Sequence, residues 1–584
     1  MRGGAIAALL CSAASAAAAA RAPRFNIVHI LLDDFGWAEV GFHRSAAGAG
    51  AAGAGTGAGA GAGAGTAAGQ QRQQQADVST PVLDGLAAES LELRRFYVHK
   101  ICSPTRCSLQ SGRAPIHVNV VNVLPESTNP ADPVGGYQGI PINITTMAQL
   151  LARGGYRTAA VGKWDVGMAT PRHSPLARGY QSWLGYWHHS NDYWEQTEEV
   201  CSGRPVRDLW RINSTYNGPA TELANDPGCT DKSQRAAKSG GRCVFEDAIL
   251  TQEVLRVLHE QQPGAQPLFL FWAPHLVHMP LQVPRAELEK FSFIADPFRK
   301  RMHTMVHYLD REIGTVVSSM KQGELWQESL VVIHADNGGE IMGAGTCGGN
   351  NWPLRGGKFA NWEGGIRVLA MVTGGALPSA RRGQHESGLL AVWDWLPTYA
   401  ALAGVDAADP VAAAAGLPPM DGVDAWPLIS GEVGAVRNEI VIGDTSAIPP
   451  NGDGQAIVGG LIWQPTNSST KLWKLLLGAV NKGQLIEMAV LTGPSWPNLT
   501  SHLVPLEHTR RCGRTAATGC LYELNSDPTE ISTLAEAEPA VFAHMLRRVE
   551  ALQAGVYSPD RGSTNLAACA KAEARGFYWG PFMD

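Results

Sequence analysis

The sequence predicts an α/β protein built around a large, mainly parallel sheet with helices on both faces. Three observations support this class. Apolar runs of strand length alternate with amphipathic helical segments, which is the pattern of a covered parallel sheet. A composition of 45% hydrophobic and 17% charged residues is ordinary for a globular protein and excludes a wholly disordered chain. The length of 584 residues exceeds what one hydrophobic core usually organises, so we expect two domains.

The first 22 residues read as a secretory signal peptide. Arg2 precedes an apolar run and a tail of small residues, and we expect cleavage between Ala20 and Ala22; a plain alanine-rich leader is the alternative. No later segment has about 18 unbroken apolar residues, so we expect no membrane span. A net charge of -6 gives no reason to expect nucleic acid as a partner.

Residues 23–436 are predicted to form the larger, N-terminal domain. Residues 45–75 interrupt it with a Gly/Ala/Gln-rich stretch that has no large side chains to bury, which predicts a low-complexity surface insertion. Outside that stretch, strands are expected at 25–32, 158–161, 267–273 and 329–335, and helices at 80–93, 145–156, 246–260 and 299–320.

Residues 437–584 are predicted to form a smaller domain, in which an antiparallel sheet is backed by a helix. Strands are expected at 456–463 and 471–478, a strand and turn at 520–534, and an amphipathic helix at 540–553.

The ten cysteines fit an oxidising compartment. Cys11 leaves with the signal peptide, and setting Cys102 aside leaves eight, an even number compatible with disulfides. Cys229 with Cys243 and Cys512 with Cys520 are the closest candidate pairs, and the sequence does not fix the connectivity. Four N-x-S/T sequons agree with the secretory route: Asn143, Asn213, Asn467 and Asn498.

Four predicted strands each end in polar residues. The strand at 25–32 runs into Asp33 and Asp34, and the strand at 329–335 into Asp336 and Asn337. The other two lead into Lys163 to Asp165 and into His275 to His278. Each alone is ordinary turn chemistry. Together, at the carboxyl edge of one sheet, they predict a site.

The predicted site combines oxygen ligands with basic groups. Three carboxylates and an amide, with no His or Cys zinc pair, favour calcium or magnesium. Arg106, Lys163 and Lys358 supply positive charge suited to a sulfate or phosphate ester. Pro104 predicts a short helix from Ser103 to Gly112, which places Cys102 at the anion-binding helix start and argues against an ordinary disulfide there.

The stretch CSPTR, followed by SLQSGR, resembles the C-x-P-x-R motif of the sulfatase family. The similarity extends from the LLDD strand to the tail GFYWGPFMD, and VHMPLQVP, CGGNNWPLRGGKFANWEGG and WDWLPT look most like the arylsulfatase B (N-acetylgalactosamine-4-sulfatase) branch. The resemblance implies an alkaline-phosphatase-like fold. It also implies that a formylglycine-generating enzyme oxidises Cys102 to formylglycine, whose hydrate attacks sulfur with one hydroxyl and releases sulfate through the second.

The resemblance assigns roles by position. Asp33, Asp34, Asp336 and Asn337 would bind one Ca²⁺ together with an oxygen of the modified Cys102. Arg106 would steady the hydrated aldehyde, Lys163 and Lys358 would hold the sulfate, and His278 would protonate the leaving alcohol. The implied substrates are sulfated carbohydrates or aryl sulfates, and the implied location is the secretory pathway, either outside the cell or in a lysosome or vacuole.

One position departs from the family pattern. The family usually reads G-K-W-H-x-G, and here Asp165 stands where the histidine is expected. The histidine is associated with deprotonating the hydrated aldehyde, and an unpaired carboxylate would repel a sulfate oxyanion. Three hypotheses follow: Asp165 is the base, one of His173, His188 and His189 substitutes, or turnover is impaired.

Two other functions stay open from the sequence. A phosphatase or phosphonate hydrolase of the same fold is one, although such enzymes generally use zinc with His ligands. A secreted glycan-binding protein without activity is the other, supported only by Asp165. Among further residues, we expect His334 to be a hydrogen-bonded core histidine and Cys107 to be structural, whereas Trp183, Trp187 and Trp194 are candidates for a sugar-binding rim.

Overall fold

The protein is described by a computed structural model that covers residues 24–44, 78–230, 242–341, 347–445, 455–466, 470–480 and 511–584. The predicted signal peptide, the 45–75 insertion, Cys11, Asn467 and Asn498 lie outside the described residues. Within the described ranges, no helix is both long enough and apolar enough to cross a bilayer.

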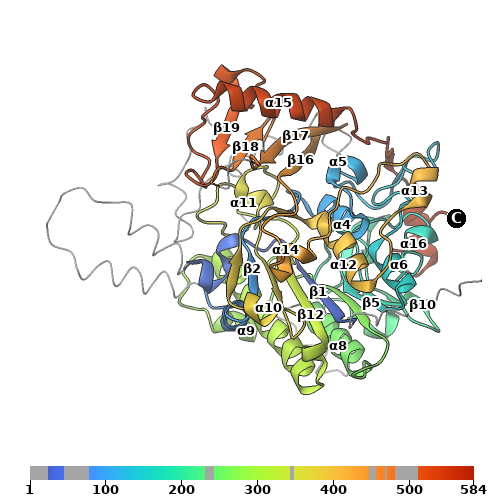
Figure 1. Cartoon of the computed structure of the whole chain (residues 1–584). Coiled ribbons are helices and arrows are strands. Elements are labelled where there is room, and N and C mark those ends of the chain that lie inside the picture. The colour runs from blue at the N-terminus through green and yellow to red at the C-terminus, as the bar shows by residue number, and fades with distance from the viewer. Residues whose placement is uncertain are drawn as a thin grey trace, which may run out of the picture.

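A ten-stranded mixed sheet runs through the centre of the molecule (Figure 1) in the order β10-β9-β6-β5-β11-β1-β12-β13-β2-β14. Neighbours from β6 to β12 are parallel, while β10, β9 and β13 run antiparallel to their neighbours. Its strands are β1 (Asn26–Leu32), β2 (Leu91–Leu93), β5 (Arg157–Gly162), β6 (Ser182–Gly185), β9 (Trp210–Ile212), β10 (Asn217–Pro219), β11 (Leu268–Ala273), β12 (Ser329–Ala335), β13 (Ala370–Thr373) and β14 (Gln384–Glu386). The predicted mainly parallel sheet is confirmed.

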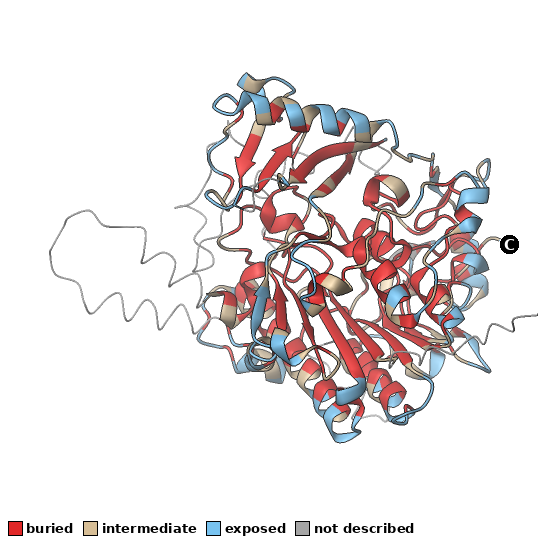
Figure 2. Cartoon of the chain, viewed as in Figure 1, coloured by how far each residue is buried: buried red, intermediate tan, exposed pale blue. Residues whose placement is uncertain are grey.

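Helices cover both faces of this sheet, so its central strands are buried throughout (Figure 2). One group consists of α3 (Pro81–Ala87), α8 (Glu246–His259) and α10 (Pro297–Gln322), and the other of α4 (Cys102–Ser111), α6 (Met147–Arg153) and α12 (Trp395–Ala403). Shorter helices are α5 (Pro115–Val118), α9 (Arg285–Glu289), α11 (Glu363–Ile366), α13 (Pro410–Ala414), α14 (Trp426–Ser430) and α16 (Ala567–Ala574). Continuous apolar runs such as β1 and β12 are therefore explained by burial on two sides.

The helix expected at 80–93 is wrong in its second half. Helix α3 begins with Pro81 in its first turn and ends at Ala87, and the chain then forms strand β2 at Leu91–Leu93. Strand β2 lies between β13 and β14, so pairing on both sides overrides the helical spacing of the leucines.

A separate four-stranded antiparallel sheet follows in the order β16-β17-β18-β19, with helix α15 (Pro539–Gln553) packed against it. Its strands are β16 (Glu439–Thr445), β17 (Ala456–Trp463), β18 (Trp473–Leu476) and β19 (Cys520–Glu523). The predicted antiparallel sheet and its helix are confirmed. Strand β16 was not expected from the sequence.

Buried ion pairs join this small sheet to the rest of the molecule. Lys474 in β18 places its Nζ 3.0 Å from Glu363 and 2.8 Å from Glu530, and all three side chains are fully buried. Lys100 pairs with Asp444 at 2.8 Å in the same region. Lys474 and Lys100 each pair with carboxylates of distant segments, so these pairs connect the small sheet to the rest of the molecule.

The last residues of the chain return to the large sheet's side of the molecule. Strand β20 (Ser563–Thr564) pairs with β4 (Ser127–Thr128), and a disulfide joins Cys201 to Cys569. The two disulfides expected from proximity, Cys229–Cys243 and Cys512–Cys520, are confirmed. Six of the eight cysteines considered are thus paired; Cys107 stays a buried thiol.

Candidate active site

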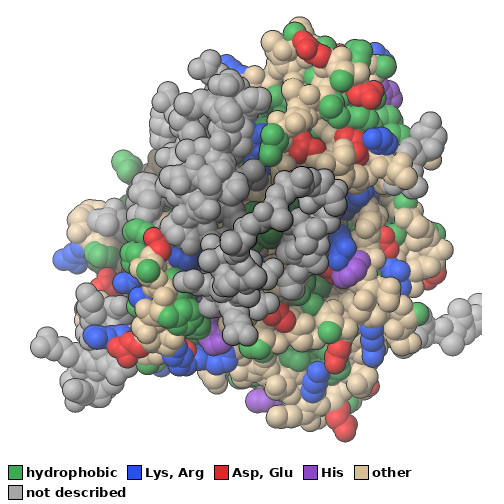
Figure 3. Space-filling model, turned by 90° about the vertical axis from the view of Figure 1, so that its left-hand side faces the viewer, with side chains coloured by type: hydrophobic (Ala, Val, Ile, Leu, Met, Phe, Trp, Pro, Cys, Tyr) green, Lys and Arg blue, Asp and Glu red, His purple; other side chains and the backbone are tan. Residues whose placement is uncertain are grey.

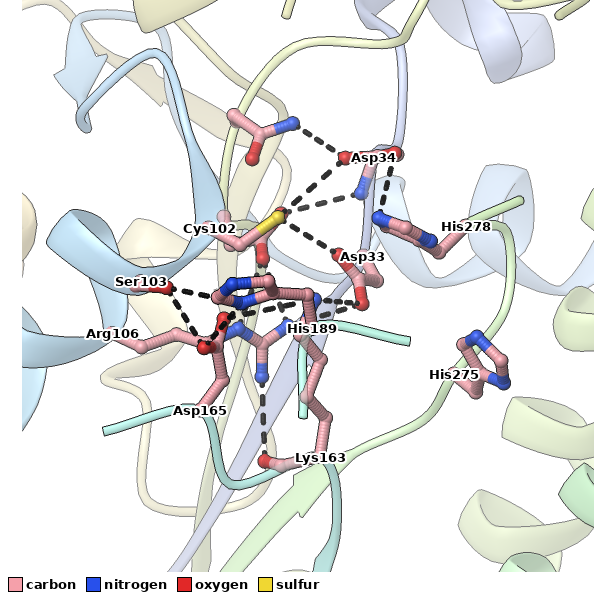
Figure 4. A network of polar contacts seen from close by, with 12 residues as sticks. Asp33, Asp34, Cys102, Ser103, Arg106, Lys163, Asp165, His189, His275 and His278 are labelled. Atoms are coloured by element: carbon pink, nitrogen blue, oxygen red, sulfur yellow. Dashed lines mark hydrogen bonds and ion pairs between the residues drawn. The ribbon is translucent and has the colours of Figure 1, made fainter. Parts of the chain in front are cut away.

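The four strand ends that the sequence singled out meet at one edge of the sheet. Strands β5, β11, β1 and β12 are consecutive neighbours and run parallel. Leu32 is in register with Ala335, and Ala273 with Gly162, so the residues that follow these four positions emerge side by side. The edge carries Asp33 and Asp34, Lys163 and His278 (Figure 4), and Asp336 follows β12 at the same edge.

Cys102 lies at the start of helix α4, facing this edge. The helix begins at Cys102, has Pro104 in its first turn and ends at Ser111; Gly112 caps it with a φ of 67°, the left-handed conformation that glycine adopts readily. The Cys102 Sγ atom lies 3.7 Å from Asp33 and 4.0 Å from Asp34. Burial raises the pKa of the Cys102 thiol well above its usual value, so the unmodified thiol is a weak nucleophile.

Each carboxylate of the cluster is held by a cation. Lys163 Nζ lies 2.8 Å from Asp33, and Lys358 Nζ lies 2.7 Å from Asp34. Arg106 donates two hydrogen bonds to Asp336, from Nε at 3.1 Å and from Nη2 at 2.8 Å. All six residues are at most 4% exposed, so their charges interact with little screening by water.

The pKa values of these groups shift in opposite directions. Burial alone would raise the pKa of Asp34, but Lys358 and His278 outweigh it and the pKa is lowered. For Asp336, burial and the neighbouring charge of Asp33 dominate over Arg106 and raise the pKa to about 6. Burial opposes the charge of Lys163, yet Asp33 raises its pKa to about 12. Lys163 therefore stays charged. Asp336, in contrast, is the carboxylate whose ionised form is disfavoured, by burial and by the negative charge of Asp33.

His278 presents one ring nitrogen to the cluster. Its Nδ1 lies 2.7 Å from the Met279 carbonyl, which only accepts hydrogen bonds, so Nδ1 carries the proton. Nε2 lies 2.9 Å from Lys358 Nζ and 3.5 Å from Asp34. Burial and the adjacent Lys358 lower the pKa of His278 to about 3.

The donor set fits a hard divalent cation. Asp33, Asp34, Cys102 and His278 place one potential ligand atom each within 4.8 Å of one another. Asp336 lies against the same group, because its Oδ1 accepts the backbone N–H of Asp34 at 3.2 Å. Asn337 donates to Asp34 at 2.7 Å, while its own buried Oδ1 has no hydrogen-bond partner among the described residues. Crowded carboxylates and an unsatisfied amide oxygen suit calcium or magnesium.

One carboxylate oxygen of Asp165 is hydrogen-bonded, whereas the other accepts no hydrogen bond from a described residue. Its Oδ1 lies 2.8 Å from His189 Nδ1 and accepts a hydrogen bond from Ser103 Oγ at 2.8 Å. Its Oδ2 accepts no hydrogen bond from a described residue and lies 3.9 Å from Lys163 Nζ. Burial would raise the pKa of Asp165, but His189 and Lys163 outweigh it and lower the pKa. The residue adopts φ 52°, a left-handed conformation that aspartate tolerates.

His189 is held between two acceptors. Nδ1 faces the ionised Asp165, and Nε2 lies 3.1 Å from the Val123 carbonyl. Both contacts require an N–H, so the hydrogen-bond pattern describes an imidazolium paired with a carboxylate. The negative charge of Asp165 is thereby compensated locally.

The other two candidate histidines do not reach Asp165. His173 is bonded to Thr170 at 2.9 Å, and His188 packs against Trp579 with ring centroids 4.8 Å apart. His334 is hydrogen-bonded to His29 at 3.0 Å inside the sheet, as expected of a core histidine. Of the three candidates, His189 is the one that contacts Asp165.

The sugar-binding rim expected from three tryptophans is wrong. Trp183 and Trp187 are buried and pack edge to face with ring centroids 4.8 Å apart, and Trp194 is 8% exposed.

Ser103 and Asn122 belong to the site and were not predicted from the sequence: Ser103 Oγ lies 2.5 Å from Asn122 Oδ1. Asn122 follows no strand and forms part of no motif, so nothing in the sequence marked it.

Comparison with known proteins agrees with this geometry. Residues 25–405, about two-thirds of the chain, match the family described as Sulfatase. The chain belongs to the sulfatase family. Arylsulfatase J of Mus musculus is 27% identical over 568 residues, which cover 95% of this chain and 80% of that protein. Arylsulfatase A of Homo sapiens is 29% identical over 437 residues, covering 72% of this chain and 71% of that one.

Solved structures support the fold. The structure of Ps i-CgsB in complex with k-i-k-neocarrahexaose aligns with a TM-score of 0.62 at 20% identity, covering 95% of this chain and 98% of that chain. The alkaline-phosphatase-like sulfatase fold is therefore confirmed. This sulfatase is a sulfuric ester hydrolase by family, which favours the sulfatase prediction over the phosphatase alternative. The arylsulfatase B branch stays a prediction.

Proposed function

We propose that this sulfatase hydrolyses the sulfate esters of sulfated carbohydrates, and aryl sulfates as model substrates. The observation that carries the proposal is the convergence of three carboxylates and three cations on Cys102 at the first turn of α4. In such a site the carboxylates can neutralise a bound metal cation, and the basic side chains can bind a tetrahedral oxyanion next to it.

We further propose that the site works with Ca²⁺ and with Cys102 converted to formylglycine by a formylglycine-generating enzyme. Asp33, Asp34, Asp336 and Asn337 would hold the ion together with the modified residue. When present, the formylglycine hydrate supplies one hydroxyl to attack sulfur and a second from which sulfate is released, which neither cysteine nor serine offers.

The chain's own cations would bind the sulfate group. Lys163 and Lys358 approach Cys102 from β5 and from the segment after β12, and each is held by one aspartate. Arg106 is one helical turn after Cys102 and orients the hydrate while pairing with Asp336. A sulfate bound between the two lysines replaces part of their pairing with Asp33 and Asp34.

His278 is the proposed proton donor to the leaving alcohol. Its Nδ1 is fixed by the Met279 carbonyl, so the proton that it donates is carried on Nε2, the nitrogen facing the cluster. A sulfate oxyanion placed beside Lys358 favours the charged imidazolium, because a nearby negative charge raises the pKa of a histidine.

Asp165 is the proposed proton acceptor from the hydrate. Its open Oδ2 and its left-handed backbone support this role. The imidazolium of His189 offsets the carboxylate's charge, which removes the expected repulsion toward sulfate. The proposal adopts the first of the three sequence hypotheses, in which Asp165 is the base, and gives His189 another role than that of a substitute base: it compensates the charge of Asp165.

The proposed partners and location follow from several features. The Ps i-CgsB structure, similar in fold, contains a neocarrahexaose. Three disulfides among the described residues suit the secretory pathway, with delivery outside the cell or to a lysosome or vacuole. Described Lys/Arg and Asp/Glu side chains are interspersed on the face in Figure 3, which does not favour nucleic acid. Residues 437–584 are proposed as a smaller domain beside the substrate cleft.

The test compares hydrolysis of an aryl sulfate and an aryl phosphate by the secreted protein, with and without a calcium chelator. We expect sulfate hydrolysis only, lost on chelation. Mass spectrometry of the peptide containing Cys102 should show the mass decrease of a thiol oxidised to an aldehyde. Full activity with an unmodified thiol would overturn the proposal, and preference for the phosphate would support the alternative enzyme.

A further inference from the structure

A cavity of about 250 Å³ is lined in part by Val123, whose carbonyl lies 3.1 Å from His189 at the active site. Three segments line it: the residues after α5 from Asn119 to Val123, the start of β17, and the stretch 557–562 that follows α15. Figure 1 shows α5 next to β16 and β17, and these elements contact one another. The volume is near the lower end for ligand pockets and suits a single sugar unit.

Arg561 lines this cavity and has no carboxylate partner. Its guanidinium donates to three backbone carbonyls, those of Tyr137, Gly139 and Val118. Two of its five N–H groups have no acceptor among the described residues. No carboxylate of a described residue forms an ion pair with it, and the residue is 9% exposed. A buried cation paired only with neutral carbonyls favours an anion.

The nearest acid in the lining is already used. Asp560 accepts the backbone N–H of Gly562 at 2.9 Å through one oxygen and the Asn129 amide at 3.2 Å through the other. The cavity thus offers the positive charge of Arg561 beside a carboxylate, that of Asp560, which is already hydrogen-bonded.

Three valines form an apolar part of the lining next to residues that contact the active site, whereas Asn119, Gln455 and Ser558 add polar groups elsewhere. Val120, Val121 and Val123 line the cavity. Between them Asn122 bonds Ser103, the neighbour of Cys102, and the Val123 carbonyl bonds His189. Four residues of extended chain span at most about 14 Å. A sugar seated against these valines is within reach of a sulfated sugar of the same molecule at Cys102.

We propose that this cavity binds the oxyanion of the sugar adjoining the one that is desulfated. The ligand class is an acidic sugar unit, with either a uronate carboxylate or a second sulfate placed against Arg561. The cavity would make the enzyme prefer polyanionic oligosaccharides over isolated sulfate esters. This inference rests on the proposed function for the substrate, but its binding step does not require turnover.

The test uses Val121→Asp, which places a carboxylate in the cavity, and Val121→Asn as the neutral control of the same shape. Substrates are an aryl sulfate and three sulfated disaccharides, whose neighbouring sugar is neutral, carries a uronate or carries a second sulfate. For the wild type we expect kcat/KM to be about tenfold or more higher with the preferred acidic neighbour, the gain of one charged hydrogen bond. The two acidic disaccharides distinguish the carboxylate from the sulfate.

Val121→Asp should remove that preference, mainly through KM, and change aryl sulfate hydrolysis less than about twofold, while Val121→Asn keeps the preference. Equal kcat/KM for neutral and acidic neighbours, or an equal loss in both variants, would overturn the cavity assignment. Arg561→Met should also remove the preference, with its melting temperature recorded because Arg561 holds three carbonyls.

A binding measurement separates the two proposals. A disaccharide that lacks the sulfate ester to be hydrolysed but keeps the preferred acidic group on the adjoining sugar is titrated into Cys102→Ala protein, with and without Val121→Asp. Binding that Val121→Asp abolishes supports the cavity even where no sulfate ester is hydrolysed. Absence of binding in a protein whose Cys102 form hydrolyses aryl sulfates overturns the cavity and leaves the proposed function intact.

Discussion

Two regions of the molecule bury charge, and they do so in different ways. At the carboxyl edge of the large sheet, the cations pair with carboxylates, but Asp165 Oδ2 and Asn337 Oδ1 stay without a hydrogen bond from a described residue. At the junction with the small sheet, Lys474 lies 3.0 Å from Glu363 and 2.8 Å from Glu530, and Tyr97 donates to the remaining oxygen of Glu363. Glu530 Oε1 also lacks an aligned hydrogen bond, but a cation lies 2.8 Å from it, whereas the cation nearest to Asp165 Oδ2 is 3.9 Å away.

The difference separates a site from a connection. Buried polar groups without partners destabilise a fold, so they persist where something else will satisfy them. The catalytic edge also holds Asp34 and Asp165 in left-handed backbone conformations. The junction has one such residue, Glu530, and directs its charges at one another. Substitutions at the catalytic edge should therefore abolish activity. Substitutions at the junction should instead lower the free energy of unfolding.

Cys102→Ala is expected to have the largest effect of the substitutions that compare the catalytic edge with the junction. We expect turnover of an aryl sulfate to fall on the order of 10⁴-fold or more, as when a nucleophile is removed. Thermal unfolding should change little, because the contacts of Cys102 Sγ with Asp33 and Asp34 are long, 3.7 and 4.0 Å. Cys107→Ala on the same helix is the matched control and should keep turnover. Comparable turnover in the two variants would contradict a catalytic role for residue 102.

Lys474→Met tests the junction with the opposite signature. It leaves two buried carboxylates without their cation, which should lower the free energy of unfolding by about 3–5 kcal/mol. The kcat of the folded fraction should stay unchanged. Chemical denaturation measures the first and active-site-titrated kinetics the second. The control is Lys471→Met, a half-exposed lysine 3.6 Å from Glu523, for which we expect less than about 1 kcal/mol.

Asp165→Asn tests whether the open carboxylate at the edge takes part in turnover. Because loss of a proton acceptor typically lowers rates about 10²–10⁴-fold, we expect kcat to fall within that range. Ser103→Ala removes one hydrogen bond to Asp165 but keeps its charge, and should lower kcat much less. The pair Asp165→His with His189→Asp exchanges the two groups and should recover part of the rate. Full turnover in both Asp165→Asn and Asp165→His would show that Asp165 has no catalytic part.

Four central strands of the large sheet, β5, β11, β1 and β12, could be predicted because they are continuous apolar runs buried on two faces. The same reason placed Asp33, Lys163 and Asp336 together, since parallel strands end at one edge. The other six strands, which are shorter and lie toward the sheet's two edges, were not predicted. Strand β2 was lost because leucines at 91 and 93 also fit a helix, and only pairing with β13 and β14 decides between them.

The partner of Asp165 could not be chosen from the sequence. His173, His188 and His189 are equally polar and lie within one stretch, and only the fold turns His189 toward the site. Burial also decided against the tryptophan rim, because aromatic residues near a site fill a core as readily as they line a surface. Local pattern identifies strand ends, whereas side-chain direction beyond them depends on tertiary packing.

The smallest expected effect concerns the pH dependence of the junction. Burial, with the like charge of Glu363 nearby, raises the pKa of Glu530 from 4.5 to about 7 despite Lys474. Between these pH values the folded protein holds a proton that the unfolded chain has released, so the free energy of unfolding should fall as pH rises, by on the order of 1–3 kcal/mol. Glu530→Gln keeps the oxygen that accepts the Glu363 N–H and removes the titration, so its stability should be flatter across this window. Denaturation midpoints from about pH 4.5 to 7, with exposed Glu536→Gln as control, measure the difference. Parallel curves for wild type and Glu530→Gln would mean that Glu530 does not titrate between these pH values. Its pairing with Lys474 would then not account for the pH dependence of stability, and this difference between the junction and the catalytic edge would be lost.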